Sequence, residues 1–162
     1  MRSTLSTTTR ARAADPLTRG LRLLVGIAAL AITAWVLVSY SSLPPTVPTH
    51  FDASGAPDDT GPRWTVLVLA GVMVLVTAGL LALSTRPAML NYPTPLTEST
   101  APAVHRAGAR TLAGTALAVQ VLYLGGAMAV IVGGGGALLP IGLLLLVAAL
   151  VMGIIAMVRA AR

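Results

Sequence analysis

Cysteine and lysine are absent from the chain, and acidic residues are rare, with only five Asp and Glu among 162 residues. Without cysteine, disulfides, thiolate metal sites and cysteine nucleophiles are excluded. Charged residues amount to 10% of the chain, whereas hydrophobic residues amount to 56%. A chain of this length cannot hide so much apolar surface in one small soluble core. We therefore expect a large part of its surface to face lipid.

The apolar residues gather in four stretches, and each is long enough to cross a bilayer, which takes about 20 helical residues. The stretches are 21–40, 64–85, 111–132 and 137–158, and Arg22 is their only charged residue. In lipid every backbone polar group must be satisfied within the segment, which favours helix. The alternating segments of about ten residues that build a β-barrel are missing. The sequence predicts an all-α integral membrane protein with four transmembrane helices, as a single domain over residues 21–162.

Arginine is distributed unevenly among the segments that flank these stretches. Ten of the eleven arginines lie before or at the very start of the first stretch, between the second and third, or after the fourth, and only Arg63 lies between the first and second. Because basic residues collect in cytoplasmic segments, we expect both termini and the middle loop in the cytoplasm of a multi-pass cell-membrane protein. The basic tail, residues 1–20, is expected to be disordered near anionic lipid headgroups, so nucleic acid is not expected as a partner.

The first apolar stretch has an alternative interpretation as the hydrophobic part of a secretory leader, because arginines precede it and Ser39 and Ser41 resemble a cleavage site. The hydrophobic part of a leader runs about 7 to 15 residues. This stretch is longer, so a spanning helix is the favoured interpretation.

The loop between the first two stretches is rich in proline and is expected to be ordered outside the cytoplasm. Pro44, Pro45 and Pro48 should hold residues 43–49 extended, because proline restricts its own φ and the residue before it. Residues 52–55 have Asp first and Gly last, which is typical of a β-turn. A second turn is predicted at residues 56–59.

The middle loop, residues 86–110, contains four prolines that rule out one continuous helix through it. We expect it to lie along the inner membrane surface, with a short helix capped by residues 97–100 and Pro102 in the first turn. Residues 133–136 link the last two stretches so closely that these helices should form an antiparallel pair.

Two features within the third stretch are predicted to serve packing. Gly125, Ala129 and Gly133 recur every four residues, so small side chains share one helix face and let another helix of the chain approach closely. Gln120 is the most polar side chain deep in any stretch. A structural hydrogen bond to another helix is favoured over a role in transport.

Catalytic and metal-binding groups do not converge in this topology. His50 and His105 fall on opposite sides of the membrane, and ion-coupled transport normally needs ionisable groups within the spans. Walker, HExxH and GxSxG motifs are missing. We therefore expect no enzyme activity, no cofactor and no metal site.

Three interpretations of His50 stay open. It could share a metal with Asp52 and either Asp58 or Asp59, since imidazole and carboxylate are common ligands. It could instead hydrogen-bond a loop carbonyl and hold the turn, which is the favoured interpretation. It could also act as a pH-sensing group.

The first loop carries a recognisable motif. Its residues 43–58, LPPTVPTHFDASGAPD, resemble the pattern LPxxVPxHFxxxGxPD of a bacterial membrane domain of unknown function, family sixteen-forty-eight. Asn91-Tyr92-Pro93 and Thr97-Glu98 are similar to that family's second, cytoplasmic motif, whereas Thr100, Pro102 and His105 depart from it. The resemblance covers about residues 39–110. The same domain occurs at the N-terminus of SdpI-type proteins, which are linked to immunity against secreted peptide toxins.

The leading hypothesis is a non-enzymatic membrane protein whose outer loop senses or binds a secreted peptide or antimicrobial, or confers immunity to it. In the alternative of equal weight, the motif is a folded plug over the helices, with Phe51 buried between them. A further hypothesis is an accessory subunit that relays to a membrane or cytoplasmic protein partner, and a small transporter is disfavoured. The outer-loop candidates for binding or structure are Pro44, Pro48, His50, Phe51, Gly55, Pro57 and Asp58. The cytoplasmic motif candidates are Asn91, Tyr92, Pro93, Thr97 and Glu98.

Overall fold

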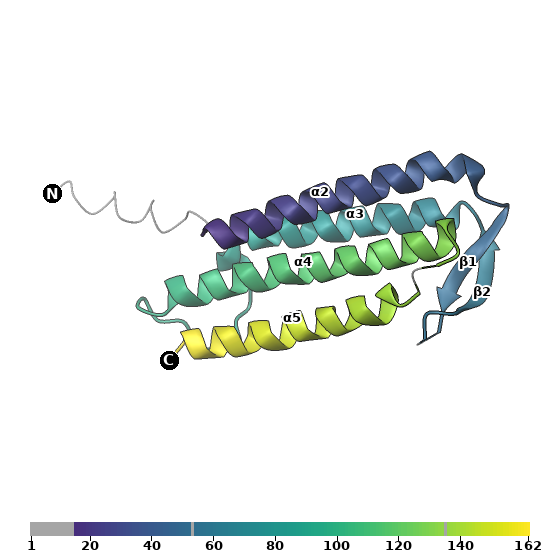
Figure 1. Ribbon diagram of the computed structural model, residues 1–162. Helices are drawn as coiled ribbons and strands as arrows, with labels where there is room; N and C mark the ends of the chain where they lie inside the picture. Colours follow the sequence, from purple (N-terminus) through teal and green to yellow (C-terminus); the bar gives the residue numbers. More distant parts are fainter. Residues whose placement is uncertain (1–14, 53, 135) are drawn as a thin grey trace.

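The computed structural model describes residues 15–52, 54–134 and 136–162, and within them the chain is mostly helical. Four long helices run along one another, and a small β-hairpin covers one end of the bundle (Figure 1). Their bounds are α2, Pro16–Ser39; α3, Thr65–Ser84; α4, Ala101–Ile131; and α5, Leu138–Ala160. All four are long and apolar enough to cross a membrane, so the prediction of four spans is confirmed.

The first helix begins earlier than the sequence suggested, because Asp15 caps it. The Asp15 side chain accepts hydrogen bonds from the Thr18 backbone N–H at 3.1 Å and from Thr18 Oγ1 at 2.9 Å, and Pro16 occupies the first turn. Both features favour a helix start. Residues 16–20 are therefore helical and do not belong to a disordered tail. The rest of that predicted tail, residues 1–14, lies outside the described residues.

The central helix of the bundle is α4, which packs against α2, α3 and α5. Its 31 residues correspond to about 46 Å, which exceeds the roughly 30 Å of a hydrocarbon core by several turns. The prediction of a separate short helix in the middle loop is therefore wrong. Residues 101–110, with Pro102 in the first turn, are continuous with the third span, because nothing after Pro102 interrupts the helix.

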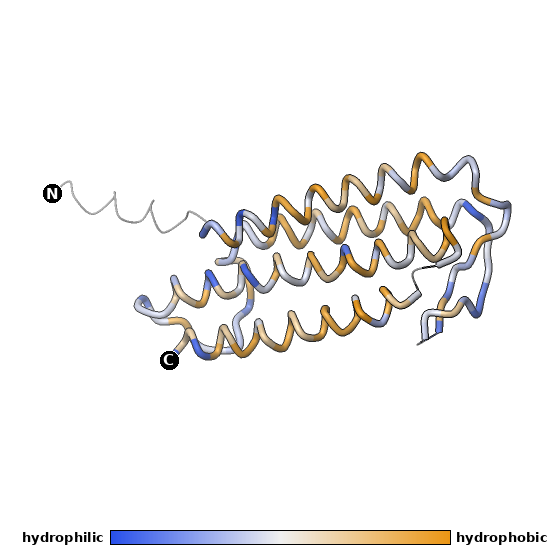
Figure 2. Tube along the Cα trace, in the orientation of Figure 1, coloured by the Kyte–Doolittle hydropathy of each residue, from blue (hydrophilic) through white to orange (hydrophobic). Residues whose placement is uncertain are grey.

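The other three helices expose most of their side chains, as expected for surfaces that face lipid. In the most apolar part of α4 56% of the residues are buried, against 17% in α2 and α3 and 11% in α5. Figure 2 shows hydrophobic residues along the helices and hydrophilic residues at both ends of the bundle. The protein is thus a membrane-embedded bundle in which one helix supplies most of the core.

Close contact between α4 and α5 depends on glycine. A Cβ at Gly125 would lie 2.9 Å from Leu138 Cβ, and one at Gly142 would lie 2.8 Å from Leu122 Cγ. At Gly153 an added Cβ would overlap the Thr111 side chain. The predicted antiparallel pairing of the last two helices is confirmed, and Gly125 faces a helix of the same chain, as predicted. The 133–136 link contains Gly135, which lies outside the described residues.

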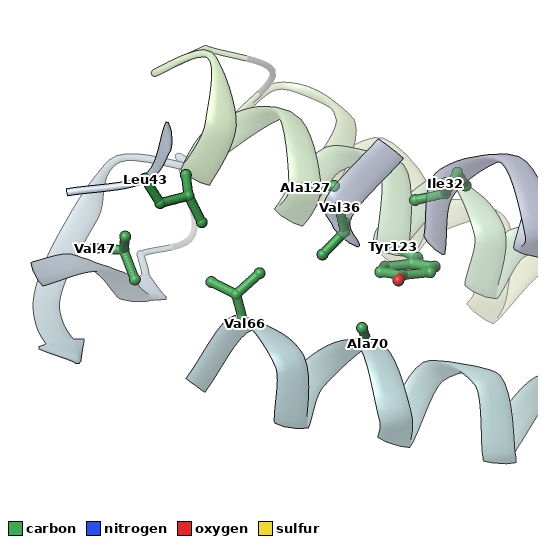
Figure 3. Packing of buried hydrophobic residues seen from close by; sticks show 8 residues of the cluster. All are labelled: Ile32, Val36, Leu43, Val47, Val66, Ala70, Tyr123 and Ala127. Atoms are coloured by element: carbon green, nitrogen blue, oxygen red, sulfur yellow. The ribbon is translucent and has the colours of Figure 1, made fainter. Parts of the chain in front are cut away.

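A compact apolar cluster lies where the helices meet the hairpin (Figure 3). Its side chains come from α2, the following loop, β1, α3 and α4, and all are at most 7% exposed. The members are Ile32, Val36, Leu43, Val47, Val66, Ala70, Tyr123 and Ala127. The cluster joins the loop to the helical bundle, so the hairpin is part of the fold and not a free appendage.

Candidate functional site

The proline-rich loop forms a two-stranded antiparallel hairpin of β1, Thr46–Phe51, and β2, Pro57–Pro62. The expected extended conformation is confirmed, but the pairing of the two strands was not foreseen. Two register shifts leave Thr49 on β1 and Asp58 on β2 without direct partners. Such bulges reorient side chains locally. The predicted second turn at residues 56–59 is wrong, because most of these residues belong to β2.

The hairpin turn is held by the Asp52 carboxylate. Asp52 Oδ1 accepts hydrogen bonds from the backbone N–H groups of Ser54 and Ala56, at 2.8 and 3.0 Å, and from Ser54 Oγ at 2.6 Å. The Gly55 N–H bonds to the Asp52 carbonyl at 2.9 Å, which confirms the predicted turn. These hydrogen bonds, led by that from the Ser54 side chain, lower the pKa of Asp52. The Asp52 carboxylate therefore stabilises the turn.

Gly55 is required for two reasons. Its φ of +86° is a conformation that residues with a side chain rarely adopt. An added Cβ would also overlap the carbonyl of Gly136 in the link between α4 and α5. The turn of the hairpin thus contacts the link between α4 and α5 at the same end of the bundle (Figure 1).

His50 pairs with Asp58 across the hairpin, through His50 Nδ1 and Asp58 Oδ1 at 2.6 Å. The two side chains are 70% and 45% exposed, so solvent reaches the pair. The histidine partner is therefore a carboxylate, not the loop carbonyl that we favoured. Over the described part of the chain, no three His, Asp or Glu side chains gather closely enough to hold a metal ion.

Phe51 and Pro48 border an apolar hollow of about 110 Å³ between the hairpin and the helices. Its walls are contributed by β1, the start of α3 and the end of α4. They consist of Pro48, Thr49, Phe51, Thr65, Val66, Leu69, Gly126 and Val130. Phe51 is only partly buried and is not enclosed between helices as the plug hypothesis required. Val47, not Phe51, is the side chain that anchors the strand, at 1% exposure.

Sequence reasoning did not select Val47 or Leu43, although both lie in the motif. The signal that could have found them is that each is an aliphatic residue in a loop otherwise made of prolines and polar residues. Such a side chain is expected to pack against another part of the protein. Pro44 and Pro57 are exposed. Arg63, directly after β2, donates to the Leu43 carbonyl at 3.3 Å and stacks over the Tyr40 ring at 5.3 Å.

The second motif lies at the opposite end of the bundle and supports the start of α4. Tyr92 donates from its hydroxyl to the Pro87 carbonyl at 2.6 Å, and its ring covers Gly108, where an added Cβ would lie 3.0 Å away. Burial raises the pKa of Tyr92. The Thr97 backbone N–H donates to Thr100 Oγ1 at 3.1 Å ahead of α4. The motif thus has a local structural role.

The remaining members of that motif are exposed. Asn91, Pro93 and Glu98 face solvent in the loop. The ribbon places this loop and the hairpin at opposite ends of the helices, so the two motifs do not form one site (Figure 1).

The polar residue in the middle of the bundle joins two helices. Gln120 is 3% exposed and donates from Nε2 to Thr77 Oγ1 of α3 at 2.8 Å. One turn further along α4, the Tyr123 hydroxyl lies 3.2 Å from Thr33 Oγ1 of α2. The interhelical hydrogen bond predicted for Gln120 is present.

These observations define a multi-pass membrane protein in which a hairpin between two spans is packed on a four-helix bundle. Residues 26–74 match the family described as Domain of unknown function (DUF1648), so the chain carries a DUF1648 domain. That domain spans most of α2, the hairpin and the first half of α3. The second motif, from Asn91 to Glu98, lies beyond the matched residues.

An uncharacterized protein of Archaeoglobus fulgidus is similar over 58 residues, with 41% identity. The similar segment covers 36% of this chain and 32% of that protein, so the chain matches about a third of the relative's length. No solved structure matches the chain.

Proposed function

We propose that the protein is a non-enzymatic membrane protein whose hairpin binds a cationic, amphipathic peptide or antimicrobial at the outer surface of the cell membrane. In this proposal the protein detects such a compound or confers immunity to it. The observation that carries the proposal is an apolar hollow of about 110 Å³ under a hairpin that also carries three carboxylates.

The chemistry of the hairpin is complementary to such a peptide. Asp52, Asp58 and Asp59 give it three carboxylates, whereas Arg63 is its only cation and already contacts Leu43 and Tyr40. Membrane-active peptides combine basic residues with apolar side chains such as Leu, Phe and Trp. One apolar side chain would enter the hollow beside Phe51, and a basic residue would lie near Asp58.

The distribution of the arginines supports this orientation. Among the described residues, the hairpin end has one arginine and the opposite end has seven, so the positive-inside rule favours a hairpin outside the cytoplasm. A reporter enzyme fused after Gly55 should then be active only outside the cytoplasm. Activity only in the cytoplasm would refute both the orientation and the proposed function.

Binding is tested with the intact protein in lipid nanodiscs of neutral lipid and a panel of cationic amphipathic peptides. Phe51→Ala should weaken binding about tenfold, because it removes a wall of the hollow, and Asp58→Asn should weaken it less and make it less dependent on salt. Thr60→Ala is the matched control, because Thr60 is exposed on the same hairpin and does not line the hollow.

The cellular test uses deletion of the gene and exposure of the cells to secreted peptide toxins and membrane-active antibiotics. Wild type and Thr60→Ala should restore resistance, and the double variant His50→Ala, Phe51→Ala should not. Unchanged sensitivity in the deletion strain would count decisively against immunity.

A further inference from the structure

The end of the bundle opposite the hairpin has an unusual cation within a span. Arg22 lies in the second turn of α2, and its Nε donates to Ser84 Oγ, the last residue of α3, at 2.9 Å. A second donor, Nη2, bonds to the Ser84 carbonyl. Ser84 itself is completely buried. The guanidinium is therefore held in a fixed position between α2 and α3.

The positive charge of Arg22 has no direct ion-pair partner among the described residues, although the Asp15 carboxylate attracts it from a longer distance. All five acidic residues of the chain are among the residues that the structure describes, and none of them forms an ion pair with Arg22. Three of them lie on the hairpin at the other end, and Asp15 is paired with Arg110 at 3.2 Å. A guanidinium has five N–H donors, and Ser84 engages two of them. The other three donors have no hydrogen-bond partner in the described part of the chain.

More arginines surround this position. Arg19 lies one turn earlier on α2, and Arg86 follows Ser84 by two residues, and both are exposed. Beside the guanidinium, the exposed Leu23 on α2 and Leu83 on α3 present apolar surface toward the membrane. The position therefore combines fixed N–H donors, excess positive charge and lipid-facing side chains.

We propose that Arg22, held in position by the buried Ser84, binds the phosphate of an anionic phospholipid, with Arg19 and Arg86 as additional cationic groups. Arginine suits this role because its planar fork bonds two phosphate oxygens at once. The position in the helix agrees, since Arg22 lies about 9 Å along α2 from Pro16, and a long arginine side chain this near a helix end can reach the headgroup region. This site is independent of the function proposed for the hairpin.

The test measures thermal unfolding of the intact protein in neutral detergent, with added phosphatidylglycerol or phosphatidylcholine. Phosphatidylglycerol should raise the unfolding midpoint of the wild type by about 5 °C, and phosphatidylcholine should not. Arg22→Gln should lose most of this increase. Arg159→Gln, which removes a charge at the same end but from α5, should keep it.

Equal losses in Arg22→Gln and Arg159→Gln would overturn the proposal, because they would mean diffuse attraction without a site. Glycerol phosphate without acyl chains should stabilise much less, and equal stabilisation would identify a free phosphate ester as the ligand and refute the lipid. If Arg22→Gln does not fold, Ser84→Ala is compared with Thr85→Ala, whose exposed side chain does not contact Arg22. The proposal requires the larger loss in Ser84→Ala, and equal losses would refute it.

Discussion

The two ends of the helical bundle differ in charge and in the way they are built. The hairpin end carries three aspartates and one arginine, and an apolar cluster joins it to the helices. The opposite end carries seven described arginines and two carboxylates, and polar contacts join its helices. The hairpin end also contains Gly55, whose positive φ the turn requires, and the apolar hollow. Damage to packing should therefore affect the first end most, and changes of charge should affect the second.

The largest effect is expected when a charge enters the apolar cluster. Val47→Asp would bury a carboxylate without a partner, which costs about 3–5 kcal/mol and should separate the hairpin from the bundle. Limited proteolysis should then cut the hairpin while circular dichroism still shows the helices. Thr46→Asp, at an exposed neighbour in the same strand, is the control. A protected hairpin in Val47→Asp would show that the cluster does not hold it.

A smaller effect is expected at the turn. Gly55→Ala introduces a Cβ at a φ of +86° and against the Gly136 carbonyl, so the cost should be about 1–3 kcal/mol. Chemical denaturation in mixed micelles measures it, with Gly114→Ala as control because nothing lies within 4 Å of a Cβ there. If both variants were equally stable, the turn would not depend on its contact with the α4–α5 link.

At the opposite end, Asp15 tests the contribution of charge. Asp15→Ala removes the helix cap and the contact with Arg110 and should cost about 1–2 kcal/mol. Asp15→Asn keeps a capping side chain and loses only the charge, so it should cost less. A larger cost for Asp15→Asn than for Asp15→Ala would contradict this role.

The pH dependence of stability gives a second measurement of Asp15. Burial raises its pKa, but hydrogen bonds from Arg110 and Thr18 and the charge of Arg110 outweigh this and lower the pKa to about 2. Because the folded pKa lies below the ordinary value, the stabilisation is complete above about pH 5 and is lost as the pH falls toward 2. Asp15→Asn should lack this part of the pH dependence.

The smallest effect is expected for the His50–Asp58 pair. Both side chains are exposed, so their coupling should be at most about 1 kcal/mol, as is usual for surface ion pairs. A double-mutant cycle of His50→Ala and Asp58→Ala measures the coupling. A much larger value would mean that the hairpin end also depends on charge, and the contrast between the two ends would be weakened.

The sequence was sufficient for the four spans because lipid allows few structures, and a run of about 20 apolar residues has a nearly unique interpretation. It also predicted the turn from Asp52 to Gly55, because Asp at the first position and Gly at the last are typical of a β-turn, whose geometry depends on neighbouring residues alone. It did not predict the pairing of β1 with β2, because prolines in both strands argue against a ladder of backbone hydrogen bonds. The pairing also depends on contacts with residues outside the two strands.

Residues whose roles depend on distant partners were misjudged or missed. One of the two hypotheses of equal weight anchored the loop through Phe51, yet the buried side chain of β1 is Val47. The helix with Pro102 in its first turn was expected to be short and separate, yet it continues into the third span, because no residue after Pro102 interrupts it. Ser84 has no signal in the sequence, because its importance comes from Arg22, 62 residues earlier.

The contact between Arg22 and Ser84 also bears on how the protein is assembled. The ribosome makes Arg22 well before Ser84, so the first span enters the membrane before its partner for this guanidinium exists. Once the second span has entered, the contact joins the first and second spans at one end, and the hairpin joins them at the other. The contacts between these two spans and the hairpin are therefore available before the third and fourth spans are made, and α4 later completes the apolar cluster with Tyr123 and Ala127.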